Sequence, residues 1–398
     1  MMYKQVSNLY IRLLILSIVI ILSLVLIVPI FSGCGGMAAS NTFIELLSLV
    51  PADYTSGETG PTFYTLYDFA RYYKDKGITF STFNELLYSD VDTEMTVWLI
   101  GWGSDINGYG KYANSTTITD ENMGYDLTNI DAEIQFGMPP TNGVASIGRF
   151  SPQDTANALK NQNEWPSWAV TAYDTEQYNG VTIHSWGSGL ETHLTTRLSP
   201  PHIDNLGRAR PLALTDKYLF CGFSIEAVKL MIDSSQHKIQ TLADLPEYTE
   251  VANGLADLNV YAAIIGDSTL VDYSVFPITF TTTTLTEVEQ AAVMAKLGTG
   301  LKNFLTFGSG VGRDERGTYN AIVIYHEDSD TAQENAARLK QHLETDSSIV
   351  KNIPWTEIIT STDIRAEGNM LIAKLYVDHY SYWSAWVYMR DNLIFIEK

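Results

Sequence analysis

Three histidines recur at a regular spacing that invites comparison with a metal site. His184, His193 and His202 are separated by nine residues each. A zinc site needs three or four ligands that meet at one point, usually with at least one close pair. Nine-residue spacing gives neither a helix face shared by the three side chains nor a short chelate pair. The pattern therefore favours surface or loop histidines.

Two acidic segments resemble partial calcium sites. His326–Asp330 (HEDSD) joins a histidine to three acids, and Ser104–Gly108 (SDING) resembles half of a calcium loop without its later glutamate. Oxygen-rich clusters can bind Ca²⁺, but neither segment has the EF-hand order. Acids near residue 330 have an ordinary role beside a helix start. We predict no metal and no cofactor.

Gly308–Gly312 (GSGVG) follows an apolar segment that is predicted to be a strand. A phosphate-binding loop would continue into Lys-Ser/Thr and an apolar helix, whereas charged residues follow here. The pattern predicts a flexible turn. The chain also contains no Gly-x-Ser-x-Gly nucleophile motif. No catalytic residue is assigned.

The tryptophans include two close pairs that could bind a ligand. Trp165 and Trp168 flank a proline, and Trp383 and Trp386 lie in an aromatic segment with helical spacing. On an exposed surface they would stack on sugar rings or anchor a protein partner. Packed against the sheet, they would be core aromatics. We take these four residues as candidate binding residues.

The chain has two cysteines. Cys34 ends the segment Phe31-Ser32-Gly33-Cys34, which resembles a bacterial lipobox, in which the cysteine becomes the lipid-bearing N-terminus after cleavage. The resemblance departs from the usual pattern at Phe31, where an aliphatic residue is common. Cys221 lies in an apolar segment and is predicted to be a buried core residue.

Residues 1–33 have the layout of an export signal. Lys4 and Arg12 precede an apolar run of 19 residues from Leu13 to Phe31, close to the ~20 residues that span a bilayer as a helix. Two interpretations stay open: a cleaved lipoprotein signal with lipid on Cys34, and an uncleaved transmembrane helix. Both place the bulk of the chain outside the cytoplasm, tethered to a cell membrane.

Composition excludes some partners and sets the size of the core. The net charge is −21, with 46 acidic against 25 basic residues, so the chain repels nucleic acid and anionic lipid headgroups. Hydrophobic residues make up 45%, which is typical of a folded protein rather than a disordered one. The length favours two domains.

Strand and helix patterns alternate after a short tether at 34–42. We predict an α+β fold with two modules, residues 43–268 and 269–398. The element order in each approximates the β-α-β-β-α-β order of ferredoxin-like folds. Each module is expected to have an antiparallel sheet with helices on one face.

Local signals mark where several of these elements begin or turn. Ser151 before Pro152 and Ser224 are predicted N-caps. Thr331–Glu334 has the form of a capping box. Asn179–Gly180 favours a hairpin turn, although the loop is expected to be longer than two residues.

Residues 123–267 resemble an uncharacterised family of exported bacterial and archaeal proteins, many of them lipoproteins. The pieces that carry the resemblance are Gly124–Leu127, Tyr178–Val181, Ala213–Leu219 running into Ser224–Lys229, and Ser235–Tyr248. The resembling segment, 123–267, covers a little over a third of the chain. The resemblance implies an exported protein with a domain of unknown function and implies no catalytic residue.

These patterns favour a membrane-anchored, extracytoplasmic, non-enzymatic binding or scaffold module of the cell envelope, with an envelope protein or a glycan as partner. One alternative is an envelope hydrolase with a site spread over loops 104–120 and 187–210. The other is a sugar or peptide receptor that uses the Trp-rich surfaces. An enzyme would gather His and acidic side chains from those loops in one pocket, and a receptor would line a cleft with Trp.

Overall fold

The computed structural model describes residues 41–54, 63–79, 123–125, 127–137, 143–160, 173–186, 210–222, 224–272, 297–378, 382–388 and 391–397. Several predictions of the sequence lie outside these ranges: Cys34 and the segment before it, Ser104–Gly108, Trp165, Trp168, His193, His202, and the loops 104–120 and 187–209. No helix within the described ranges is both long and apolar enough to cross a membrane.

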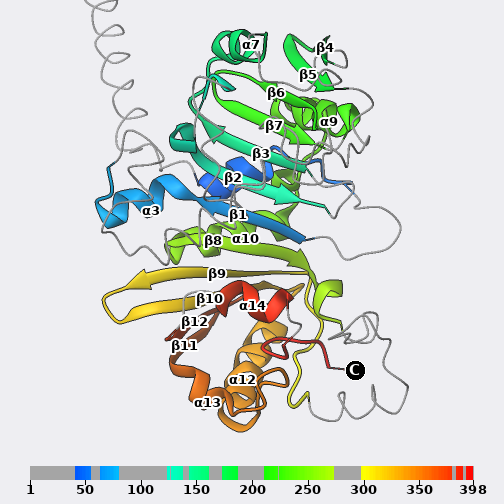
Figure 1. Ribbon diagram of the computed structural model, residues 1–398. Coiled ribbons are helices and arrows are strands. Elements are labelled where there is room, and N and C mark those ends of the chain that lie inside the picture. Colours follow the sequence, from blue (N-terminus) through cyan, green and yellow to red (C-terminus); the bar gives the residue numbers. More distant parts are fainter. Residues whose placement is uncertain are drawn as a thin grey trace, which may run out of the picture. The chain divides into compact units, whose positions relative to one another are not determined.

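Twelve strands of the described residues form one sheet in the order β11-β12-β10-β9-β8-β1-β2-β3-β7-β6-β5-β4 (Figure 1). In chain order they are β1 Phe63–Asp68, β2 Ile130–Phe136, β3 Gly143–Gly148, β4 Tyr173–Tyr178, β5 Val181–Trp186, β6 Leu212–Leu214, β7 Tyr218–Gly222, β8 Val260–Asp267, β9 Thr306–Asp314, β10 Gly317–Tyr325, β11 Ile359–Glu367 and β12 Met370–Val377. Every neighbouring pair is antiparallel. The fold class is therefore α+β with an antiparallel sheet.

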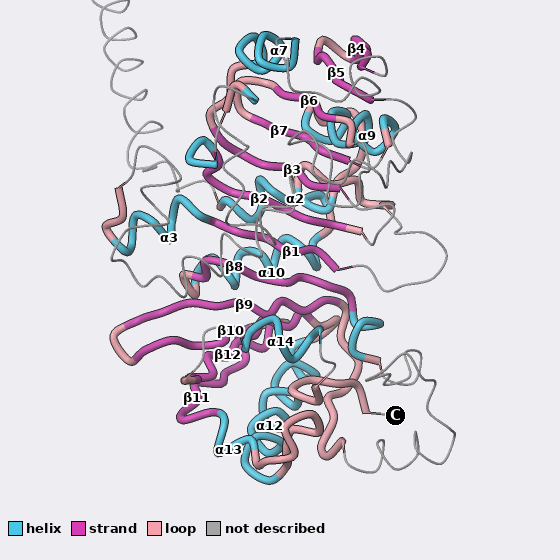
Figure 2. Tube along the Cα trace, viewed as in Figure 1, coloured by secondary structure: helices cyan, strands magenta, loops and turns pink. Residues whose placement is uncertain are grey.

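The helices cover both faces of this sheet, as the tube in Figure 2 shows. They are α2 Thr42–Leu47, α3 Phe69–Lys76, α7 Pro152–Lys160, α9 Ile225–Ser235, α10 Pro246–Asp257, α12 Ser329–Thr345, α13 Trp355–Ile358 and α14 Tyr382–Tyr388. Helices α2, α9 and α10 pack into one core layer, and α3, α7, α12, α13 and α14 pack into the other.

The expectation that each module has helices on one face is wrong for residues 43–268, whose helices lie on both faces. In residues 269–398 the helices α12, α13 and α14 all pack into one layer, as expected, and α10 packs against β9 and β10. The reason for two helical layers lies in the central strands, whose apolar residues do not alternate with polar ones. All of β8 except Asp267 is buried, so neighbouring side chains that point to opposite faces are both covered. A sheet of such strands needs a helical layer on each side.

Two local predictions are confirmed, and a third is confirmed in part. The Ser224 hydroxyl accepts a hydrogen bond from the Ala227 amide at the start of α9 (3.2 Å). The Ser151 hydroxyl accepts one from the Asp154 amide (3.2 Å) at the start of α7. Asn179–Gly180 forms the turn between β4 and β5. The expected longer loop is wrong: the turn has only two residues, because the exposed polar positions of β4 still pair with β5 up to Tyr178 and Val181. Both turn residues have positive φ (51° and 82°), as a type I′ turn requires.

The segment Gly308–Gly312 is a buried strand and not a flexible turn. It lies within β9, between β8 and β10. The glycines allow close packing, because a Cβ atom at Gly308 would lie 2.7 Å from side-chain atoms of Leu255 and Val251. A Cβ atom at Gly310 would lie 2.8 Å from the carbonyl oxygen of Ala262 on β8. Glycine clusters in strands mark such close approaches.

We expect Gly310→Ala to lower the free energy of unfolding by about 1–3 kcal/mol, because the added methyl group would clash with a side-chain atom of Val260 and lie 2.8 Å from the Ala262 carbonyl oxygen, which belongs to the backbone of β8. Without these contacts, Ala in place of Gly in a strand would be stabilising by about 0.5–1 kcal/mol. Chemical denaturation measures the difference, with the exposed β11 variant Thr362→Ala as control. A Gly310→Ala protein as stable as the parent would contradict the packing described.

Candidate functional site

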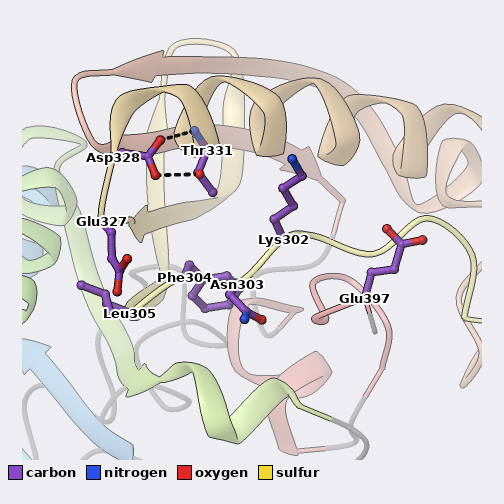
Figure 3. Close-up of a pocket in the computed structure, with 8 residues that line it drawn as sticks. All are labelled: Lys302, Asn303, Phe304, Leu305, Glu327, Asp328, Thr331 and Glu397. Carbon is purple, nitrogen blue, oxygen red and sulfur yellow. Dashed lines mark hydrogen bonds between the residues drawn. The ribbon is translucent and has the colours of Figure 1, made fainter.

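A pocket of about 470 Å³ lies where three segments meet: the residues that lead into β9, the corner between β10 and α12, and the C-terminal end (Figure 3). Its size is in the range of small-molecule sites. The lining residues are Lys302, Asn303, Phe304, Leu305, Glu327, Asp328, Thr331 and Glu397.

Asp328 caps helix α12 at the pocket wall. Its carboxylate accepts hydrogen bonds from the Thr331 amide (2.7 Å) and the Thr331 hydroxyl (2.9 Å), and these bonds hold the pKa of Asp328 below its usual range. The helix begins at Ser329. The predicted capping box at Thr331–Glu334 is therefore wrong, because an aspartate three residues earlier supplies the cap.

Asn335 ties the pocket floor to the same helix. Its Oδ1 accepts the Lys302 amide (2.8 Å), and its Nδ2 donates to the Lys302 carbonyl oxygen (3.0 Å). The Asn335 side chain is fully buried. A buried amide satisfied in this way holds a defined position for the chain segment that it binds.

His326 lies behind the pocket with both ring nitrogens engaged. Its Nδ1 is 3.1 Å from the carbonyl oxygen of Asn369, and its Nε2 is 3.0 Å from Asn335 Nδ2. Because a carbonyl oxygen only accepts, we assign the proton to Nδ1, and Nε2 accepts from Asn335. Burial lowers the pKa of His326, so the ring is neutral at neutral pH. His326 is a structural residue of the pocket wall.

The residues of the acidic segment after His326 thus have separate structural roles. Glu327 lines the pocket, Asp328 caps α12, and Ser329 and Asp330 belong to the first turn of that helix. Within the described part of the chain, no group of His, Cys, Asp and Glu side chains is arranged to hold a metal ion.

Ion pairs with residues of α12 compensate two of the charges at the pocket, those of Lys302 and Glu397. The Lys302 ammonium pairs with Glu334. Arg338 pairs with Glu334 (3.1 Å) and with Glu397, and it also donates to the Gly300 carbonyl oxygen (3.1 Å). The pairs with Lys302 and Arg338 contribute to the lowered pKa of Glu334.

Glu327 differs from these charged residues. Its carboxylate makes no hydrogen bond or ion pair with another described residue, and Figure 3 shows it near the side chain of Leu305. The Leu305 side chain is 37% exposed, whereas the large apolar residues of the core are covered. An uncompensated carboxylate beside an exposed apolar side chain gives the pocket an amphipathic end.

The C-terminal segment reaches the pocket through contacts with α12 and with the segment before β9. Leu301 accepts a hydrogen bond from the Glu397 amide and donates one to the Phe395 carbonyl oxygen (both 2.8 Å). His342 lies 2.7 Å from the Asn392 carbonyl oxygen through Nε2 and 2.8 Å from Asp346 through Nδ1. These bonds place Glu397 at the pocket.

Sequence reasoning missed Asn335, and a signal for it exists. The buried positions of α12 are Ala332, Asn335, Leu339, His342 and Leu343. They follow the spacing of three and four that marks an apolar helix face. A polar residue on that stripe must find a buried partner or cost stability, so such a residue predicts a tertiary hydrogen bond. It does not predict which segment supplies the partner.

The structure places Trp383 and Trp386 in the core and not on an exposed platform. Each is 1% exposed. The Trp386 indole nitrogen donates to the Ser309 hydroxyl of β9 (3.0 Å), and that hydroxyl donates to the Trp383 carbonyl oxygen (2.7 Å). The central strands present apolar side chains to this face, and α14 covers them. Trp165 and Trp168 lie outside the described residues.

Two other residues that the sequence singled out are also buried. Cys221 on β7 is 2% exposed, so its prediction as a core residue is confirmed. His184 on β5 is 3% exposed, so its prediction as a surface residue is wrong. Its Nδ1 lies 2.9 Å from the Tyr173 hydroxyl. Burial, with a smaller contribution from Lys160, lowers the pKa of His184 to about 4.

Comparisons with known proteins give no family assignment. No family model matches the chain, and no curated protein matches it. Among solved structures, crystal form I of TP0453 is similar at a TM-score of 0.37 and 8% identity, covering 87% of this chain and 96% of that one. Crystal form III of TP0453 has a TM-score of 0.36 at 7% identity, covering 86% and 97%. These values lie below the level at which a shared fold can be inferred.

The buried His184 predicts a pH dependence of stability. Its pKa is lower in the folded than in the unfolded chain, so the unfolded state binds the proton more readily and stability falls as the pH drops below about 6.5. Between about pH 7 and about pH 5 this group alone should remove about 2 kcal/mol of unfolding free energy. Denaturant titrations of His184→Gln should show a shallower pH profile by that amount.

The exposed His237 supplies the control, since Asn can take its positive φ (53°). His237→Asn should keep the pH profile of the parent. A His184→Gln profile that parallels the parent would show that His184 is not the group responsible.

Proposed function

We propose that this protein is a binding or scaffold module of the cell envelope, held at a membrane by its N-terminal segment. One observation carries the binding part of the proposal: the pocket walls are hydrogen-bonded to α12 through groups of the chain itself. Asn335 holds Lys302 through both backbone groups, and Arg338 holds Glu397 and the Gly300 carbonyl oxygen. A preorganised site loses less conformational entropy when it binds.

The chemistry of the pocket favours binding over catalysis. The neighbouring imidazole, His326, uses one nitrogen as donor and the other as acceptor within the wall, so it is not poised as a general base, which needs hydrogen-bond reach to a substrate proton. Asp328 is committed to the helix cap. The alternative hydrolase site in loops 104–120 and 187–210 falls almost entirely outside the described residues and stays a prediction.

The membrane attachment rests on the sequence of residues 1–34. Lys4, Arg12, the apolar run from Leu13 to Phe31 and the small residues before Cys34 have the layout of a lipoprotein signal. A cysteine that carries several acyl chains would anchor the protein stably, since each buried methylene contributes about 0.8 kcal/mol. The resemblance of residues 123–267 to exported lipoproteins supports the same location.

We also propose that the two modules, 43–268 and 269–398, are each a variant of the ferredoxin-like fold. The β10–α12–β11 connection supports this for the second module. Strands β10 and β11 both pair antiparallel with β12, so they run parallel to each other with one strand between them. This arrangement is the split β-α-β unit from which ferredoxin-like folds are built.

Site-specific photocrosslinking tests the binding function. A benzoylphenylalanine at Leu305, in the pocket, should give a discrete adduct when cells that express the full chain are irradiated. The same group at Leu230 on α9 is the matched control, because Leu230 is 39% and Leu305 37% exposed, and only Leu305 lines the pocket. Adducts of equal yield at both positions, or none at Leu305, would contradict the proposal.

A membrane preparation from the same cells tests the anchor through the intact mass of the protein. Loss of residues 1–33 with a gain of acyl mass, absent from a Cys34→Ala chain, would support the lipoprotein. A full-length chain without lipid would mean that Leu13–Phe31 is the transmembrane anchor.

A further inference from the structure

The pocket combines acidic and apolar groups in an arrangement that selects the chemistry of its ligand. Three carboxylates line it, from Glu327, Asp328 and Glu397, against the single ammonium of Lys302. The Lys302 charge is compensated by Glu334, and the Glu397 charge by Arg338. What remains is the Asp328 carboxylate, held ionised at the helix cap, and the uncompensated carboxylate of Glu327. The pocket therefore attracts positive charge.

The helix start does not reverse this preference. The first turn of α12 has partial positive charge from its backbone amides, but Asp328 caps that turn through the Thr331 amide and hydroxyl. Asp330, in the same turn, adds a second negative charge. An anionic ligand would meet these two carboxylates before it met a free backbone amide.

An apolar surface lies beside the acidic one. Leu305 and Phe304 belong to the segment that leads into β9, and Figure 3 shows Leu305 next to Glu327. Leu305 is 37% exposed, although the chain around it buries its other large apolar side chains. Leu305 therefore offers contact to the alkyl part of a ligand whose charged end reaches Glu327. The volume of about 470 Å³ leaves room for such a chain.

We propose that this pocket binds an alkylammonium group, presented as the lysine side chain of a protein partner. The aliphatic stem of the lysine lies against Leu305, and its ammonium group lies between Glu327 and Asp328. The inference rests on the proposed binding function and specifies the ligand. A lysine-bearing segment also suits a module with a net charge of −21, because the acidic surface steers basic partners toward it.

Binding of small probes to the full-length protein in detergent tests the ligand class. The probes are Nα-acetyl-lysine methylamide, its norleucine counterpart, which has the same stem without the charge, and cadaverine, which is a free diamine. Ligand-observed NMR should show that the lysine probe binds and that the norleucine probe binds at least about fivefold more weakly, with the difference shrinking as salt is added.

Variants assign the effect to the pocket. Glu327→Gln should weaken the lysine probe about three- to fivefold, as expected for one partly exposed ion pair. Glu344→Gln, at the exposed far end of α12, should leave the affinity unchanged. Leu305→Ser should weaken the lysine probe, and Leu230→Ser should not.

Each outcome decides a separate claim. Equal binding of the lysine and norleucine probes, or an affinity unaffected by Glu327→Gln, would overturn the alkylammonium site. Cadaverine binding without lysine-probe binding would overturn the protein side chain as the source of the amine. If an adduct still formed at Leu305 in cells while no probe bound, the ligand class would be wrong but the binding function would stand. Absence of both would reject the two proposals together.

Discussion

The pocket depends on one buried amide. Asn335 is on the apolar face of α12, where leaving a polar side chain without partners would cost about 1–3 kcal/mol. It is satisfied by both backbone groups of Lys302 and by His326. The residues that lead into β9 are therefore fixed against a helix that follows them in the chain. This contact positions Lys302, whereas the cap of α12 positions Asp328 and the ion pair with Arg338 positions Glu397.

The same helix, α12, also packs against the sheet. Because the central strands are apolar on both faces, the chain needs helices on both sides, and α12 covers the end formed by β10, β12 and β11. Over its 17 residues, one face of α12 packs on the sheet. Asp328, at the start of the helix, faces the pocket, and Arg338, on its flank, faces the C-terminal segment. Helix α12 thus contributes both to the packing of the sheet and to the wall of the pocket.

Most local features were predictable from the sequence, with the misplaced cap of α12 as the exception, and long-range ones were not. Ser224 and the Asn179–Gly180 turn were identified correctly, because caps and turns depend on neighbouring residues. Gly308–Gly312 was misread, since the reason for its glycines is the helix α10 and the strand β8 packed against it. The tie between Lys302 and Asn335 joins residues 33 apart, and the strand order pairs β8 with both β1 and β9. Periodicity contains no information on such pairings.

Amide hydrogen exchange at Lys302 tests this account most directly. The Lys302 amide donates to Asn335, whereas the adjacent, exposed Asn303 amide makes no hydrogen bond with a described residue. If the pocket is preorganised, Lys302 should exchange at least about a hundredfold more slowly than Asn303, and Asn335→Ala should abolish the difference while β9 stays protected. Equal and fast exchange of the two amides in the parent protein would show that α12 does not hold the pocket.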